Sequence, residues 1–85
     1  MSLRCLIVDD EPLARRGLRH RLALLEGLEV VAEASNGREA LAAIAEHAPD
    51  LMFLDIQMPG VDGFGLLQSL PVSEWPMVIF VTAYD

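Results

Sequence analysis

Three short, uninterrupted apolar runs restrict the possible folds of this chain more than any other feature. They cover residues 5–8, 51–54 and 77–81. A strand with one face in water alternates apolar and polar residues, whereas a run without alternation indicates a strand buried on both faces, as in a parallel sheet covered by helices. A weaker fourth strand is expected over residues 28–33, where two adjacent valines favour extended backbone.

Between these runs, apolar residues recur at helical spacing. Residues 12–25 form one expected helix, in which Pro12 suits the first turn and Gly27 the stop, and its apolar stripe is Ala14, Leu18, Leu22 and Leu25. Residues 37–48 form a second, because Asn36 and Glu39 have the spacing of a capping box. A third helix is expected around residues 64–70. The resulting order of strands and helices, β-α-β-α-β-α-β, predicts a doubly wound α/β sheet with right-handed crossovers.

The charged residues exclude several classes of function. The chain has 13 acidic and 6 basic residues, a net charge of −7, and all the basic residues are arginine. A nucleic-acid-binding domain is expected to be basic, while Schiff-base enzymes and lysine-type phosphate loops need a lysine. The single cysteine, Cys5, cannot form an internal disulfide, and no apolar run is long enough to cross a bilayer. We therefore expect a soluble, cytoplasmic protein with no membrane partner.

Oxygen-bearing side chains follow each of the three apolar runs. Asp9 and Asp10 follow the first, Asp55 the second and Thr82 the third. Ligands of doubly wound sheets bind beyond the carboxyl ends of the strands, so these side chains are expected at one edge. Crowded carboxylates either share protons or hold a cation, and an oxygen-only set suits Mg²⁺ better than Zn²⁺. Beside such an ion, a carboxylate could attack a phosphoryl group, and Thr82 could donate to one of its oxygens.

Each of these residues also has a simpler explanation. Asp10 or Glu11 could cap the helix that begins at Pro12, Asp55 could shape a turn, and Thr82 could be an ordinary strand-end residue. The arginines at positions 15, 16, 19 and 21 are interpreted as a solvated helix face, with a partner-binding surface as the alternative. The conjunction of four side chains at one edge favours a functional site, but spacing alone leaves the two explanations about evenly matched.

The chain resembles the receiver domains of response regulators in two-component signalling, and the resemblance runs along its whole length. The matching segments are residues 6–12 (LIVDDEP), 50–63 (DLMFLDIQMPGVDG) and 81–83 (VTA), together with the Asn36-Gly37 pair before the second helix. The stretch from Asp55 to Gly63 is the specific part of this match. The resemblance implies a flavodoxin-like fold, an α/β parallel sheet with strand order 2-1-3-4.

The resemblance also implies a role for each candidate residue. Asp55 would be the phosphoacceptor, which takes a phosphoryl group from a sensor histidine kinase, and the module would signal rather than turn over a substrate. Mg²⁺ would be held by Asp9, Asp10, Asp55 and the backbone carbonyl of Gln57, and Thr82 would be the switch hydroxyl. The sequence around Asp55 and after Thr82 looks most like regulators with a LytTR-type DNA-binding output, so DNA would be contacted only through an output domain outside residues 1–85.

Receivers of this family continue beyond the Thr-Ala pair with another helix, strand and helix, and that strand ends in a lysine that contacts the phosphoryl group. Residues 1–85 are therefore expected to be the N-terminal two-thirds of a receiver, without that lysine. We expect this chain to be phosphorylated weakly or not at all, because a cationic contact is missing. We also expect it to self-associate or form a swapped dimer, because its last apolar strand would be an exposed edge.

Three other functions are compatible with the fold. A magnesium-dependent phosphatase with an aspartyl-phosphate intermediate is disfavoured, because Gln57 stands where haloacid-dehalogenase-like enzymes place a second acid. An interaction module that uses the fold without phosphorylation is the main alternative. A flavodoxin-like nucleotide binder ranks lowest, since residues 9–11 would repel a flavin phosphate unless a metal intervened.

Overall fold

A parallel sheet lies between two helices in the computed structural model, which describes residues 2–55 and 68–81. The strands are β1 (Leu3–Val8), β2 (Leu28–Ala34), β3 (Leu51–Asp55) and β4 (Met77–Val81). They pair in parallel in the order β2-β1-β3-β4. The expected α/β class and the expected strand order 2-1-3-4 are both confirmed.

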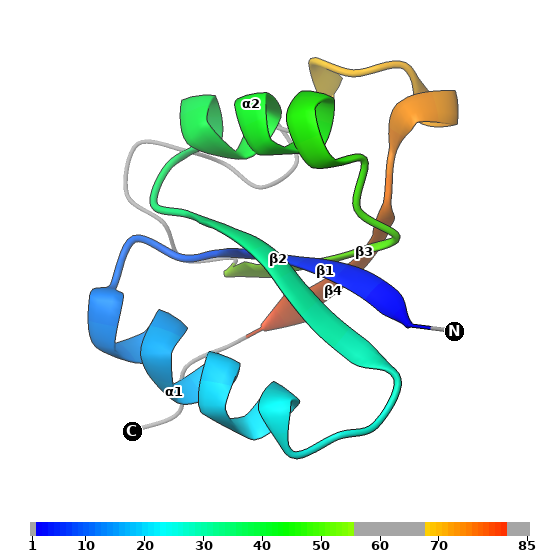
Figure 1. The fold of residues 1–85 in the computed structure, drawn as a ribbon. Helices are drawn as coiled ribbons and strands as arrows, with labels where there is room; N and C mark the ends of the chain where they lie inside the picture. Colours follow the sequence, from blue (N-terminus) through cyan, green and yellow to red (C-terminus); the bar gives the residue numbers. More distant parts are fainter. Residues whose placement is uncertain (1, 56–67, 82–85) are drawn as a thin grey trace.

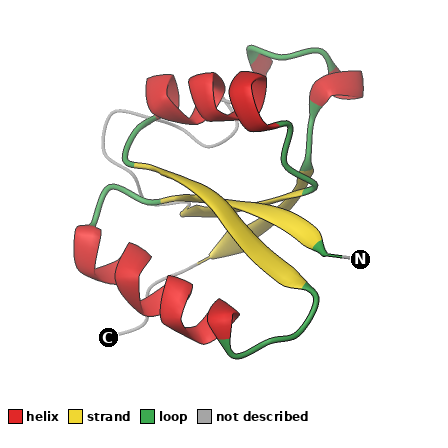
Figure 2. Cartoon of the chain, viewed as in Figure 1, coloured by secondary structure: helices red, strands yellow, loops and turns green. Residues whose placement is uncertain are grey.

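The two helices cover opposite faces of the sheet (Figure 1). Helix α1 (Pro12–Ala23) packs against β1 and β2 on one face, and α2 (Gly37–His47) packs against the same strands on the other. A short 3₁₀ helix, η1 (Val72–Glu74), precedes β4, and Figure 2 shows how loops join these elements. Among the described helices, none is long and apolar enough to span a membrane.

The core lies mainly on the α2 face of the sheet. Alternate residues of the central strands point to this face and are almost fully buried, as expected for strands covered by a helix. They pack against small residues of α2, which let the helix approach the sheet closely. The cluster consists of Leu6, Val8, Ala34, Ala40, Ala43, Ile44, Met52 and Leu54.

Helix α2 begins at the expected capping box. Asn36 Oδ1 accepts a hydrogen bond from the Glu39 N–H at 2.8 Å. The Glu39 carboxylate reaches back to Ser35 rather than to Asn36, and it accepts from the Ser35 N–H at 2.8 Å and from the Ser35 hydroxyl at 2.6 Å. The helix ends at a left-handed residue, Ala48 with φ 45°, and Pro49 follows it. The cap therefore fixes the point where the chain leaves β2 and turns over the sheet.

The apolar stripe expected for α1 is only partly correct. Leu22 is buried and Leu18 half-buried, but Ala14 is exposed and Leu25 is 54% exposed. The helix ends at Ala23, so Leu25 lies beyond the last turn, where helical spacing no longer determines the direction of a side chain. The third expected helix, over residues 64–70, lies mostly outside the described residues.

A β-bulge in β2 alters which side chains face α1. The register shifts between Cys5 and Leu6 of β1, so Val31 has no partner there, and Glu33 pairs with Ile7. Residues paired across neighbouring strands share a face of the sheet, so Glu33 lies on the same face as Ile7 and points toward α1, where it meets Arg15. If the register did not shift, Glu33 would pair with Val8 and face the apolar core.

Candidate functional site

The carboxyl ends of β1 and β3 bring two predicted site residues together. Val8 pairs with Leu54 in the sheet, and Asp9 and Asp55 are the next residues along the two strands. Asp10 follows Asp9 in the loop before α1. One carboxylate oxygen from each of the three aspartates lies within 4.8 Å of the others. Asp9 and Asp55 are half-buried and Asp10 is exposed, so the cluster opens to solvent on one side.

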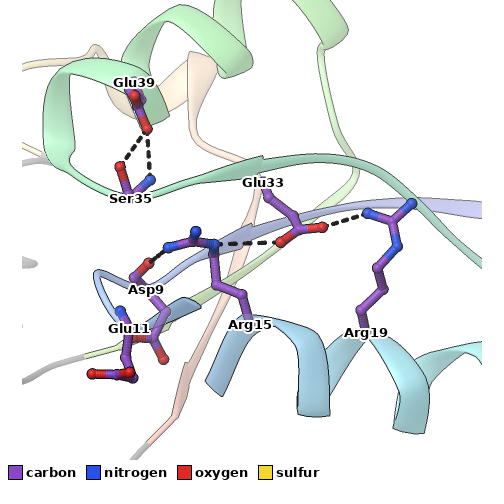
Figure 3. A network of polar contacts seen from close by, with 7 residues as sticks. All are labelled: Asp9, Glu11, Arg15, Arg19, Glu33, Ser35 and Glu39. Carbon is purple, nitrogen blue, oxygen red and sulfur yellow. Dashed lines mark hydrogen bonds and ion pairs between the residues drawn. The ribbon is translucent and has the colours of Figure 1, made fainter. Parts of the chain in front are cut away.

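Asp9 is held at three of its polar atoms, and two of the residues that hold it are drawn in Figure 3. Its N–H donates to the Ala34 carbonyl of β2 at 3.0 Å. Its carboxylate Oδ1 accepts from the Glu11 N–H at 2.9 Å, and its carbonyl oxygen accepts from Arg15 Nη1 at 2.6 Å. The peptide and the carboxylate of Asp9 are therefore both restrained before any ligand binds.

The helix-cap explanation for the acidic residues is wrong in its details. Glu11 occupies the cap position of α1, but its side chain makes no capping hydrogen bond. Asp10 does not occupy that position. The carboxylate of Asp9 instead accepts the Glu11 N–H just before the helix, as in an Asx turn.

The electrostatics of the cluster favour a bound cation. Burial raises the pKa of Asp9, the Glu11 N–H lowers it, and the neighbouring Asp55 and Asp10 raise it further. A raised pKa means that the folded protein disfavours the charged form of Asp9. A divalent ion would offset the repulsion among the three carboxylates, and oxygen-only ligands fit Mg²⁺. The residues present therefore fit that metal.

The two remaining predicted site residues follow β3 and β4. Thr82, which directly follows β4, and Gln57, two residues beyond Asp55, lie outside the described residues. Val81 pairs with Asp55 at the end of the sheet, so the described chain ends one residue short of Thr82.

A separate hollow lies at the opposite edge of the sheet. It has a volume of about 440 Å³ and lies between the end of α2 and η1, near the amino ends of β3 and β4. Its lining is mostly apolar and includes Ile44, Leu70 and Trp75, with Glu74 as its acidic member. None of the three clustered aspartates contributes to it.

The sequence pattern does not reveal one residue next to the acidic cluster. It predicts a solvated helix face for Arg15, but the Arg15 side chain is only 19% exposed and contacts both Glu33 and the backbone of Asp9. The six-residue separation between Asp9 and Arg15 is compatible with this contact. The ion pair with Glu33 depends on the bulge in β2, which no local pattern reveals.

Comparison with known proteins identifies the family. A family model described as the response regulator receiver domain matches residues 5–85. The chain belongs to the response-regulator receiver family. Receiver domains carry their metal site in an acidic pocket, and the clustered aspartates of this chain lie at the corresponding edge of the sheet.

Individual relatives agree with this assignment. The chain is 52% identical over 83 residues to a response regulatory protein of Yersinia pestis and 43% identical over 83 residues to the transcriptional regulatory protein BtsR of Escherichia coli. Each match covers 98% of this chain and 35% of the relative, so the chain spans about a third of the length of these proteins. The receiver domain of a NarL response regulator from Mycobacterium tuberculosis superposes with a TM-score of 0.83 at 38% identity, over 99% of this chain and 68% of that one.

Replacing Asp9 by asparagine tests the cluster. Asp9→Asn should abolish Mg²⁺ binding measured by isothermal titration calorimetry. It should also stabilise the metal-free protein at pH 7 by up to about 1 kcal/mol in urea denaturation, because it removes a like charge from a partly solvated cluster. The amide oxygen can still accept the Glu11 N–H. Asp50→Asn, at the amino end of β3, is the matched control and should leave Mg²⁺ binding intact. A destabilised Asp9→Asn protein that still binds Mg²⁺ would contradict this account.

The raised pKa of Asp9 predicts a specific pH dependence. Folding favours the protonated form, so this stabilisation is present in acid, below the ordinary pKa of an aspartate, and is lost as the pH rises through the raised pKa. The stability advantage of Asp9→Asn over the wild type should therefore be largest near neutral pH and disappear in acid. The Mg²⁺ affinity of the wild type should fall as the pH drops through the same range. Urea denaturation and calorimetry across pH 3 to 8 would measure both, and a stability difference independent of pH would refute the prediction.

Proposed function

We propose that this receiver accepts a phosphoryl group on Asp55 with the help of Mg²⁺. The observation that carries the proposal is the cluster of Asp9, Asp10 and Asp55 at the carboxyl edge of the sheet. The metal, when bound, would offset the negative charge of these carboxylates and of the incoming phosphoryl oxygens. The phosphoryl donor is a phosphohistidine of a sensor histidine kinase, as the family resemblance implies.

The three aspartates have different roles in this proposal. A carboxylate oxygen of Asp55 attacks phosphorus, a P–O bond forms, and the P–N bond to the donor histidine breaks. Asp9 suits metal binding better than attack, because its Oδ1 already accepts the Glu11 N–H and both its backbone N–H and its carbonyl are held. Asp10 is exposed and contributes a third carboxylate ligand from the solvent side.

Thr82 and Gln57 complete the proposed site. The pairing of Val81 with Asp55 supports a role for Thr82 as the switch hydroxyl, because Thr82 is the next residue along β4. The backbone carbonyl of Gln57 is the proposed fourth ligand of the metal, two residues beyond Asp55. Both assignments rest on the family motif and on the positions of these residues relative to β3 and β4.

The proposed function is that of a signalling module rather than of a phosphatase. The glutamine at position 57 cannot act as a general acid, which disfavours rapid hydrolysis of an aspartyl-phosphate. A module independent of phosphorylation would not need three carboxylates within 4.8 Å, an arrangement that costs free energy without a cation. The acidic cluster therefore favours phosphorylation over this alternative.

The proposed partners follow from the relatives. Residues 1–85 would be the N-terminal two-thirds of a receiver, in line with the 68% of the NarL receiver chain that they match. BtsR is a transcriptional regulatory protein, and it supports a role in transcription through a DNA-binding output domain, proposed here to be of the LytTR type. The acidic charge of these 85 residues is consistent with indirect rather than direct contact with DNA.

Phosphorylation of the 85-residue chain tests the acceptor. Incubation with acetyl phosphate and Mg²⁺ should add a single phosphoryl group in intact-mass spectra, at a yield well below one per chain. The low yield is expected because the chain has no lysine to stabilise the transferred group, a contact that can be worth several kcal/mol.

The variants for this experiment are a matched pair of aspartates at the two ends of β3: Asp50 directly precedes the strand, and Asp55 is its last residue. Asp55→Asn should eliminate the mass gain, whereas Asp50→Asn should retain it. A gain that survives Asp55→Asn would place the acceptor elsewhere. No gain in the wild type after prolonged incubation would contradict the proposal for this chain, and a stoichiometric gain would contradict the role given to the missing cation.

We propose that the chain self-associates through the exposed apolar side chains of β4. Met77 is 67% exposed and Ile79 is 39% exposed. They pair with Leu51 and Phe53, so they lie on the α1 face of the sheet. Helix α1 packs mainly against β1 and β2 and so leaves this part of β4 exposed. A second copy of the chain could bury this surface. Sedimentation should detect reversible dimers at high concentration. Ile79→Ser should weaken these dimers, whereas Leu24→Ser, a control at the exposed residue that follows α1, should not. A wild-type chain that stays monomeric at every concentration would refute this proposal.

A further inference from the structure

Arg15 differs from the other arginines of α1 in its surroundings. Its side chain is 19% exposed, whereas that of Arg19 is 53% exposed. Its guanidinium makes two contacts on opposite sides (Figure 3). Nε lies 3.3 Å from Glu33 Oε1, and Nη1 donates to the Asp9 carbonyl at 2.6 Å. A planar guanidinium can make both contacts at once, which a single ammonium group cannot do in the same geometry.

Glu33 is available to Arg15 only because of the bulge in β2. The extra residue pairs Glu33 with Ile7 and points its carboxylate toward α1. There Glu33 bridges two arginines, because its other oxygen, Oε2, accepts from Arg19 Nη1 at 2.5 Å. The bridge is half-buried, with the Glu33 side chain 30% exposed. Arg15 therefore has a fixed partner on the side away from Asp9.

We propose that Arg15, oriented by Glu33, is a positioning residue for Asp9. Arg15 holds the peptide carbonyl of Asp9, while the Glu11 N–H holds its carboxylate, so the carboxylate keeps one direction toward Asp10 and Asp55. The inference rests on the proposed function, since it assigns the direction of Asp9 to metal binding. Losing a contact that orients a metal ligand commonly weakens metal binding by about 10- to 100-fold.

Calorimetric Mg²⁺ titration of the folded variants tests the effect on the site. Arg15→Met keeps an unbranched apolar stem but loses both polar contacts, and it should weaken Mg²⁺ binding about tenfold. Arg15→Lys should restore only part of this loss, because a lysine cannot make both contacts. Glu33→Ala should also weaken Mg²⁺ binding, because Arg15 loses the partner that orients it. The double variant Arg15→Met/Glu33→Ala should bind Mg²⁺ no more weakly than Arg15→Met alone, because Glu33 acts through Arg15.

Arg19→Ala is the matched control. It removes the other ion pair of Glu33 but no contact to Asp9, so it should change Mg²⁺ affinity by less than about twofold even if it lowers stability. If Arg15→Met loses stability but binds Mg²⁺ as tightly as the wild type, Arg15 has only a structural role and the inference is wrong.

A metal-free measurement separates this inference from the proposed function. The Glu11 N–H donates to the Asp9 carboxylate, so its hydrogen exchange, followed by NMR, reports the position of that carboxylate. Exchange of the Glu11 amide should be about tenfold faster in Arg15→Met and unchanged in Arg19→Ala. If the wild type binds no Mg²⁺ but this difference appears, the positioning role stands and the metal role fails. If Mg²⁺ binds but neither affinity nor exchange changes in Arg15→Met, the positioning role is overturned and the metal site stands.

Discussion

The pairing of β1 with β3 is the constraint on which the rest of this structure depends. Because Val8 and Leu54 are neighbours in the sheet, the residues that follow them, Asp9 and Asp55, must lie side by side. Two carboxylates in such a position repel each other. Burial raises the pKa of Asp9, and the repulsion from Asp55 raises it further. The apolar core under the sheet stabilises the pairing and so maintains an arrangement that is unfavourable without a cation.

The surrounding structure reinforces this arrangement rather than relieving it. Asp9 is held by β2 through its N–H, by the loop through its carboxylate and by α1 through its carbonyl. Restraints of this kind reduce the reorganisation needed when a ligand binds, because the direction of the carboxylate is set in advance. Asp55, the last residue of β3, lies next to this restrained carboxylate, which suits its proposed role as the group that attacks phosphorus.

Most of the fold and the clustering of the three aspartates could be predicted from the sequence. Unalternated apolar runs correctly locate β1, β3 and β4, and β1 and β3 are largely buried, but the expected burial on both faces is wrong for β4, where Met77 is 67% exposed. The edge at which Asp9 and Asp55 meet follows from parallel pairing. The position of Arg15 could not be predicted in the same way. Its burial depends on Glu33 of another strand, and the direction of Glu33 depends on the bulge at Val31. The failed prediction for Leu25 has a local cause, since α1 ends at Ala23 and helical spacing no longer applies beyond it.

The central claim is that Asp9, Asp10 and Asp55 form one cation site, and NMR with Mn²⁺ in place of Mg²⁺ tests it most directly. Mn²⁺ also prefers oxygen ligands, and its unpaired electrons broaden the signals of nearby nuclei. At low Mn²⁺ concentration, the account predicts broadening of the amide signals of these three residues, removed by excess Mg²⁺ and absent in Asp55→Asn. Broadening spread evenly over the acidic surface, or centred away from the ends of β1 and β3, would contradict it.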